Sequence, residues 1–341
     1  MIRALIVGGA AHLGAHLVEA LLRGPEPIAI TVMDLRPYAG PRAEQVVSVL
    51  GDLTAADDCA RVLGSGSFDV VFSMVTPNLR KATAEEFERV NVDGIRTLVG
   101  ACRHGEVRAL VYVSSIAVLD HFRDHIDVDE TEPLPPIEQY RSPYDRSKRL
   151  GEQLILAADR PGALRTCSLR MGGILSSMSD ITLSSLTASV VLTQNESKPI
   201  DMIYGGDAAF ALVLAMQGLL ERPDEVGGEP FFITKGRAIR SFEYATWVAD
   251  RLGRRVVVLR PLVRALIMRG SRLSVGLARR LGRPVPGIPI HDFLNITDFQ
   301  QTFDNSKAER ILGYTSQTVV EDGLTRILDE YLQQQGGAGR R

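Results

Sequence analysis

Tyr144 and Lys148 are the residues of this sequence whose types and spacing fit proton transfer most directly. They stand four positions apart at the start of an amphipathic stretch, so a helix would place both on one face, one turn apart. An ammonium at that distance would lower the pKa of a phenol from its ordinary value of about 10, because it stabilises the phenolate. The pair therefore predicts a tyrosine that works as general base or acid near neutral pH, and a lysine that also holds a nicotinamide ribose.

A double serine, Ser114 and Ser115, supplies the third chemical group. It ends an apolar run at residues 109–113, which reads as a buried strand, so the two hydroxyls should lie at the carboxyl edge of a sheet. A serine at that edge could hydrogen-bond a substrate oxygen and stabilise the charge that develops on it during hydride transfer. We take Ser115, Tyr144 and Lys148 as the candidate catalytic residues.

A glycine-rich turn follows the first apolar run of the chain and opens a helical pattern. Dinucleotide binding needs glycine in such a turn for its tightness, for close approach of the pyrophosphate, and for packing of helix on strand. Gly8 and Gly14 meet the first and third needs, whereas Ala11 stands where the second glycine is expected, so its methyl group must be accommodated. The predicted phosphate-binding residues are Gly8, Ala11, His12, Leu13 and Gly14.

Asp34 ends the second apolar run, 20 residues after Gly14. A carboxylate there accepts hydrogen bonds from the adenosine ribose and repels a 2′-phosphate, which favours NAD over NADP. Arg36, two residues later, could stack on adenine or tolerate that phosphate. We therefore expect NAD as the cofactor, with NADP less favoured.

Apolar runs alternate with helical patterns over the first 170 residues, and this order predicts the fold. Continuously apolar strands separated by helices indicate a parallel sheet covered on both faces. We expect a Rossmann-type doubly wound α/β sheet with ligands at the carboxyl ends of its strands. The expected strands are 4–7, 28–33, 46–50, 70–75, 109–113 and 164–169.

The second half of the chain has a looser pattern. Residues 171–205 show little period, while helices are expected at 207–220, 242–252 and 319–333, and a strand at 231–234. We expect residues 1–170 to form the NAD-binding core. Residues 171–334 should form a smaller, partly irregular substrate lobe with some segments returning to the core, and residues 335–341 a disordered tail.

Taken together, these segments resemble the extended short-chain dehydrogenase/reductase superfamily over nearly the whole chain. The glycine turn, Asp34, Gly51-Asp52-Leu53, Asn91-Val92-Asp93-Gly94, the double serine and the Tyr144/Lys148 pair come in that family's order. The resemblance implies that Asp52 and Leu53 lie near the adenine, that Asn91 braces the helix carrying Tyr144, and that Ser115 is the catalytic serine. It also implies a homodimer.

Later segments look like the branch of 3β-hydroxysteroid and sterol-4-carboxylate 3-dehydrogenases. The similar stretches are residues 201–204, 228–234 and 303–308. Arg170 is kept after the sixth strand, while Met171 replaces a usual proline and the region 204–207 lacks a usual valine. This branch implies a secondary alcohol or ketone on an apolar, steroid-like or lipidic substrate.

Two other functions stay open at this point. A nucleotide-sugar epimerase or dehydratase of the same superfamily would oxidise its substrate transiently with tightly held NAD; it predicts an arginine pair for the diphosphate, which residues 195–204 lack. A non-catalytic NAD-sensing scaffold would tolerate loss of the three catalytic residues, all of which are present here.

Ten arginines and no acidic residue lie between Arg251 and His291. Interleaved leucines suggest an amphipathic basic helix or helix pair. Such a segment (251–283) could contact a membrane surface, bind the phosphate of a carrier-, coenzyme A- or nucleotide-linked substrate, or be a solvated face whose arginine stems cover core.

Composition sets the remaining bounds. A net charge of −2 gives no global argument for nucleic acid binding. Three widely spaced cysteines form neither a disulfide framework nor a metal motif, and we read them as buried thiols of a cytoplasmic protein. His121 and His125 are four apart but lack further ligands, so we expect a polar loop near the active site and no metal.

Overall fold

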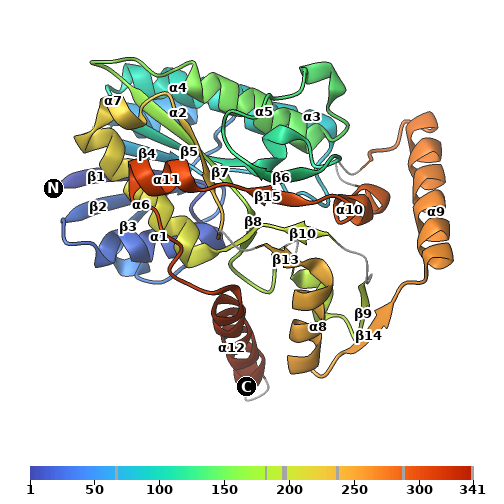
Figure 1. Cartoon of the computed structure of the whole chain (residues 1–341). Coiled ribbons are helices and arrows are strands. Elements are labelled where there is room, and N and C mark those ends of the chain that lie inside the picture. The colour runs from blue at the N-terminus through green and yellow to red at the C-terminus, as the bar shows by residue number, and fades with distance from the viewer. Residues whose placement is uncertain (66–67, 181–182, 194–197, 236–237, 286–288, 339–341) are drawn as a thin grey trace.

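A seven-stranded parallel sheet forms the centre of the computed structural model, which describes residues 1–65, 68–180, 183–193, 198–235, 238–285 and 289–338 (Figure 1). Its strand order is β12-β7-β5-β4-β1-β2-β3, and every neighbouring pair is parallel. The strands are β1 Ile2–Val7, β2 Ile28–Asp34, β3 Val46–Leu50, β4 Val70–Ser73, β5 Ala109–Ser115, β7 Arg165–Met171 and β12 Pro230–Ile233. This is the doubly wound sheet that the sequence predicts.

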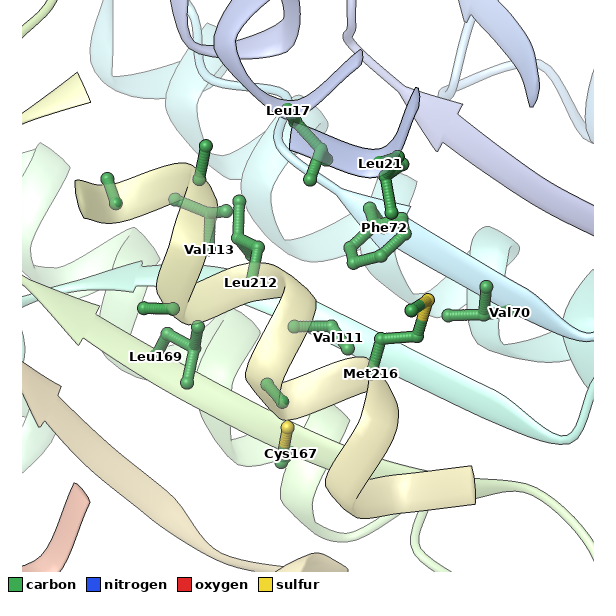
Figure 2. Packing of buried hydrophobic residues seen from close by; sticks show 14 of the residues in the cluster. Leu17, Leu21, Val70, Phe72, Val111, Val113, Cys167, Leu169, Leu212 and Met216 are labelled. Carbon is green, nitrogen blue, oxygen red and sulfur yellow. The ribbon is translucent and has the colours of Figure 1, made fainter. Parts of the chain in front are cut away.

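Both faces of this sheet are buried. Successive side chains of a strand point to opposite sides, so neighbouring residues of one strand belong to different clusters. In β1, Ala4 and Ile6 join one apolar cluster while Leu5 and Val7 join another. Helices α1 and α6 pack on the first face, where Leu212 and Met216 of α6 meet the strands and α1 (Figure 2). Residues of α2, α4 and α5 contribute to the cluster on the second face. The helices of this core are α1 His12–Arg23, α2 Ala56–Ser65, α3 Ala84–Glu88, α4 Gly94–His104, α5 Pro143–Leu156, α6 Gly205–Glu221, α7 Pro223–Val226 and α11 Ser306–Leu312.

The remaining elements are short strands and four helices. One small sheet has the order β13-β10-β15-β6, and two strand pairs are β11-β8 and β14-β9. These strands are β6 His125–Val128, β8 Gly173–Leu175, β9 Val190–Thr193, β10 Pro199–Ile200, β11 Met202–Tyr204, β13 Ile239–Arg240, β14 Arg255–Val258 and β15 Gln301–Phe303. The helices are α8 Ser241–Arg251, α9 Pro261–Arg280, α10 Ile290–Ile296 and α12 Val320–Ala338.

Several segments differ from the sequence-based expectation. In the described residues of the stretch 171–205 there are four short strands, each too short to show a period. His125 begins β6 rather than lying in a loop, since that strand pairs with β15 from far along the chain. Helix α12 continues to Ala338, so residues 335–338 are helical, and the rest of the expected disordered tail, 339–341, lies outside the described residues.

Helix α5 sits unusually close to its neighbours at Gly151. A Cβ atom added there would lie 2.4 Å from the carbonyl oxygen of Asn91 and 2.8 Å from the hydroxyl of Tyr112. Only glycine therefore allows α5 to approach the sheet at this depth, and α5 carries both Tyr144 and Lys148.

We expect Gly151→Ala to destabilise the protein by about 1–3 kcal/mol, because overpacking forces backbone to shift. Gly100→Ala is the matched control: it also lies inside a helix, α4, but nothing stands within 4 Å of an added Cβ. The control should be neutral or stabilising by about 0.5–1 kcal/mol, as alanine favours helix. Urea unfolding of both variants measures this; equal effects would contradict the close contact.

Candidate active site

The glycine turn between β1 and α1 has the shape that a phosphate-binding turn requires. Gly8 has φ +84°, in the left-handed region, and an added Cβ would lie 2.7 Å from a methyl carbon of Val75. Gly14, in the first turn of α1, lies so close to Gly9 that an added Cβ would be 2.0 Å from its carbonyl oxygen. The two glycines thus set the tight turn and the close packing that the sequence predicts.

The N-terminus of α1 is open to an anionic ligand. Its N-cap residue, Ala11, makes no side-chain capping hydrogen bond, and the first turn has no acidic residue. The first amides of a helix have no partner within it, and the helix dipole adds partial positive charge there. The residues predicted to contact phosphate, in the turn 8–14, therefore offer the free amides and partial positive charge that a dinucleotide phosphate needs. His12 is also tied to the second half of the chain, by a 2.6 Å hydrogen bond between its Nε2 and the Ser179 hydroxyl.

Asp34 joins the ends of the first three strands in sequence. Its side chain accepts hydrogen bonds from the backbone amides of Ala10, at 3.0 Å, and Arg36, at 3.2 Å. Its carbonyl accepts one from the amide of Gly51 at 3.0 Å. The carboxylate thus lies beside the glycine turn, where the ribose of a dinucleotide bound to that turn would follow. The Arg36 side chain is exposed.

Asp52 and Leu53 lie just beyond, at the end of β3. The Asp52 carboxylate accepts hydrogen bonds from the amide and hydroxyl of Thr54, both at 2.8 Å. The Leu53 side chain is buried in the apolar cluster and faces Gly94 at the start of α4. Asp52 is thus held in a local turn and Leu53 packs in the core; their assignment to the adenine stays a prediction.

The three candidate catalytic residues converge at the carboxyl end of β5. Helix α5 begins after Ser142, whose hydroxyl accepts a hydrogen bond from the Asp145 amide, and Pro143 occupies its first turn. Tyr144 follows, with its ring edge-on to Phe87 at 5.6 Å between centroids. Ser115 ends β5, and its hydroxyl accepts a 3.1 Å hydrogen bond from the Ala117 amide. It also lies close enough to the Tyr144 phenol to lower the pKa of that group. Hydroxyl and phenol thus lie together as the sequence predicts.

Lys148 is buried, and it follows Tyr144 by four residues on α5. Its ammonium nitrogen donates a 3.0 Å hydrogen bond to the carbonyl of Val113 and lies 5.0 Å from the centre of the Tyr112 ring. Burial lowers the pKa of Lys148 to about 7, and the nearby Glu152 carboxylate partly opposes this. At neutral pH the ammonium and the amine are therefore both populated.

The acidity of Tyr144 differs from the sequence-based expectation. Burial raises its pKa to about 12, although the hydrogen bond with Ser115 pulls in the opposite direction. The predicted lowering of the pKa of Tyr144 is therefore wrong for the protein without a bound ligand. The lysine that should stabilise a phenolate is itself buried and hydrogen-bonded to a backbone carbonyl. Helical spacing placed both residues on one helix, α5, but could not give the dielectric surroundings of the pair.

Two polar contacts hold α5 against its neighbours. Asn91 donates a 2.9 Å hydrogen bond to the Ser147 hydroxyl, which agrees with the bracing role implied by the resemblance. Glu152 forms a buried ion pair with Arg170 of β7, with contacts of 2.8 and 3.1 Å, and also accepts from Ser168. The sequence reasoning missed Glu152. Its spacing of four from Lys148 and eight from Tyr144, on the same helix face, could have indicated it.

The His121 and His125 side chains bond within the protein. His121 pairs with the buried Asp145, the residue after Tyr144, at 3.2 Å. Burial lowers the pKa of His121, but the Asp145 carboxylate outweighs this and the net shift is upward. His125 faces the carbonyls of Leu119 and Asp120 at 3.0 and 3.1 Å. Within the described residues, no three His, Cys, Asp or Glu side chains are grouped to hold a metal.

Comparisons with known proteins identify relatives over nearly the whole chain. The model of the 3-beta hydroxysteroid dehydrogenase/isomerase family matches residues 5–257. A sterol-4-alpha-carboxylate 3-dehydrogenase (decarboxylating) of Candida albicans is 30% identical, over 95% of this chain and 96% of its own. The human 3 beta-hydroxysteroid dehydrogenase type 7 is 29% identical over 95% of this chain and 94% of its own.

Solved structures share the fold. MoeE5 in complex with UDP-glucuronic acid and NAD has a TM-score of 0.72 and 22% identity, over 97% of this chain and 99% of its own. The dTDP-glucose 4,6-dehydratase DesIV of Streptomyces venezuelae, with NAD bound, has a TM-score of 0.72 and 22% identity, over 98% of both chains. At this identity the likeness concerns the architecture.

The buried lysine predicts an unusual pH dependence of stability. Between pH 7 and 10.5 the unfolded chain keeps a proton on Lys148 that the folded chain has released, so the free energy of unfolding rises with pH across this window. The penalty for burying the lysine is complete below pH 7. Lys148→Met removes this penalty, so it should stabilise the cofactor-free protein more at pH 6 than at pH 9, by a difference of about 2–3 kcal/mol.

Thermal unfolding at the two pH values measures this difference. Lys198→Met is the control, because Lys198 is partly exposed and pairs with Asp124 at the surface. It should change stability little, and equally at both pH values. A Lys148→Met effect of the same size at pH 6 and pH 9 would contradict the lowered pKa.

Proposed function

The chain belongs to the 3-beta hydroxysteroid dehydrogenase/isomerase family and is an oxidoreductase, and we propose that it interconverts a 3β-hydroxyl group and a ketone on a sterol or a related apolar substrate. The proposed substrate class follows the names of its relatives, several of which are hydroxysteroid or sterol dehydrogenases. The observation that carries the proposed chemistry is the meeting of Ser115, Tyr144 and Lys148 at the carboxyl end of β5.

The position of these residues relative to the glycine turn supports a shared site. The turn follows β1 and Ser115 ends β5, and only β4 separates these two parallel strands. Both therefore open on the same edge of the sheet, where doubly wound sheets bind ligands. A dinucleotide with its phosphates at α1 can extend along this edge toward Tyr144.

Oxidation of the alcohol removes a hydride and a proton. A nicotinamide held at this edge of the sheet would supply the acceptor for the hydride that leaves the carbinol carbon. Tyr144 accepts the hydroxyl proton as the C=O bond forms, and Ser115 hydrogen-bonds the same oxygen and holds it in line. In the direction of reduction Tyr144 returns the proton to the oxygen.

The electrostatics of the site set the protonation of Tyr144. A phenol with a pKa of about 12 holds its proton at neutral pH, which suits the donor role in reduction. For oxidation its pKa must fall, and a protonated Lys148 beside it supplies part of that change. Lys148 can change protonation near neutral pH because its own pKa is about 7. We propose that ligand binding shifts this pair toward a charged lysine.

We propose NAD rather than NADP as the cofactor, on the position of Asp34. Its carboxylate lies beside the glycine turn, where it would accept the ribose hydroxyls and repel a 2′-phosphate. The exposed Arg36, two residues later, would favour a phosphate instead. The expected homodimer and cytoplasmic location likewise stay proposals.

Titration with NADH and NADPH, followed by nicotinamide fluorescence, tests the cofactor site. We expect the wild type to bind NADH at least tenfold more tightly than NADPH, and Asp34→Ala to lose most of that preference, because the repulsion of a 2′-phosphate disappears. Arg36→Ala is the control and should keep or increase the preference. Unchanged selectivity in Asp34→Ala would contradict the assignment.

Activity measurements test the reaction. We expect NAD-dependent oxidation of 3β-hydroxysteroids, with kcat reduced about 10²–10⁴-fold in Tyr144→Phe, since a proton-transfer group is lost. Ser115→Ala should also reduce kcat strongly, whereas Ser114→Ala, which removes a buried hydroxyl without a hydrogen-bond partner among the described residues, should not. The proposed reaction would be wrong if the protein, freed of any copurified cofactor, bound neither NADH nor NADPH. It would also be wrong if Tyr144→Phe kept full activity.

A further inference from the structure

A histidine and a buried carboxylate join the two segments that carry the catalytic serine and tyrosine. Ser115 is followed by the 3₁₀ turn Ile116–Leu119 and, two residues further on, by His121. Asp145 directly follows Tyr144 in the first turn of α5. Its carboxylate accepts a 3.1 Å hydrogen bond from the backbone amide of His121 and lies 3.2 Å from ring nitrogen Nδ1 of the same residue. A carboxylate can only accept, so this nitrogen carries the proton. The His121–Asp145 pair therefore fastens the segment after Ser115 to the helical turn that carries Tyr144.

The backbone turn that leads into His121 is strained. Asp120 has φ +73°, in the left-handed region that residues other than glycine rarely adopt. Its amide donates a 3.0 Å hydrogen bond to the carbonyl of Ala117, and its carboxylate accepts one of 3.1 Å from the amide of Phe122. Strained backbone persists where the surrounding contacts hold it, and it is concentrated at functional sites. The contact between His121 and Asp145 ties this strained turn to α5.

Both side chains of the pair are shielded from solvent, with 14% of His121 and 2% of Asp145 exposed. Burial lowers the pKa of His121, but the carboxylates of Asp145 and Asp120 outweigh it and hold the pKa above its ordinary value of 6.5. Two further groups act on these carboxylates. The positive charge of Arg123 acts on Asp120, and Tyr140 lies near both and donates its own hydroxyl proton to a backbone carbonyl. His121 therefore changes its charge at a pH above 6.5.

The charge of Asp145 reaches the catalytic phenol. Burial is the main reason for the raised pKa of Tyr144, and the Asp145 carboxylate adds to it. Because Asp145 is buried, solvent screens its charge only weakly. A positive charge on His121 compensates that carboxylate, whereas a neutral His121 leaves it uncompensated beside Tyr144.

We propose that the His121–Asp145 pair positions Tyr144 against Ser115, and that the charge on His121 sets how readily Tyr144 accepts the proton of the alcohol. This inference rests on the proposed reaction, in which Tyr144 takes that proton. His121 and Asp145 act through Tyr144 and are therefore positioning residues. With His121 protonated the pair has no net charge; once His121 has lost its proton, the pair carries one negative charge, which disfavours the phenolate.

The pH dependence of His121→Asn tests the role of the charge. An asparagine amide can donate to Asp145 in place of Nδ1 but cannot take up a proton, so the variant mimics the neutral histidine at every pH. We expect its kcat for oxidation of a 3β-hydroxysteroid to be about three- to tenfold below that of the wild type at pH 6, and equal to it at pH 9.5, with KM unchanged. His104→Asn, which removes an exposed histidine at the end of α4, is the control and should match the wild type at both pH values.

A ratio of wild-type to His121→Asn kcat that is the same at both pH values would overturn the role of the charge, because a merely structural contact has no reason to depend on pH. Thermal unfolding of each variant at both pH values checks that it is folded under the conditions of the assay.

NMR titration of the histidine ring protons tests the pair without cofactor or substrate, so its result does not depend on the proposed reaction. The chain has six histidines, and the His121 signal is the one that His121→Asn lacks. We expect this signal to titrate above pH 6.5 in the wild type and at a lower pH in Asp145→Asn, since the carboxylate that stabilises the charged ring is gone. If His121 titrates at the same pH in both proteins, the proposal is wrong, even where the enzyme oxidises its alcohol as expected. If the protein oxidises no hydroxysteroid but this shift is found, the pair stands and the proposed reaction is at fault.

Discussion

The placement of α5 against the sheet is the constraint on which the active site depends. Tyr144, Lys148 and Glu152 lie at successive turns of one face of this helix, so a rotation or displacement of α5 moves all three. The Glu152–Arg170 ion pair fixes the helix to β7, and Gly151 lets it approach Asn91 and Tyr112 closely. Buried ion pairs often add little stability, because desolvation offsets the attraction; one nitrogen of Arg170 is buried here without a hydrogen-bond partner among the described residues. We infer that the Glu152–Arg170 ion pair serves mainly to position α5 relative to β7.

The same placement determines the chemistry of the catalytic pair. Burial pushes Tyr144 and Lys148 toward their neutral forms, which raises the pKa of the phenol and lowers that of the ammonium. The protonation states of such a buried pair respond strongly to the charge of a ligand bound beside it, since little solvent is present to screen that charge. Ser115 of β5 acts in the opposite direction on the pKa of the phenol. The site thus combines rigid positions with protonation states that a ligand can shift.

Segments from the second half of the chain pack on the seven-stranded sheet and complete it. Strand β12 extends the main sheet beside β7, and α6 covers the first face of the sheet together with α1 (Figure 2). These segments return to the core, while α9 extends away from it and leaves its leucines in solvent. One half of the sequence therefore supports the catalytic edge and also carries a helix whose leucines face solvent.

The sequence by itself determined whatever depends on neighbours in the chain. Continuous apolar runs marked the first six strands of the sheet to within two residues, the glycines marked the turn, and a spacing of four put Tyr144 and Lys148 on one helix face. Only the tertiary structure decided properties that depend on distant residues: the pKa of Tyr144, the pairing of Glu152 with Arg170, the strand β6 and the solvent exposure of the α9 leucines. Local spacing fixes distances along a helix or strand, whereas burial, charge pairing and solvent exposure depend on which other segments fold around it.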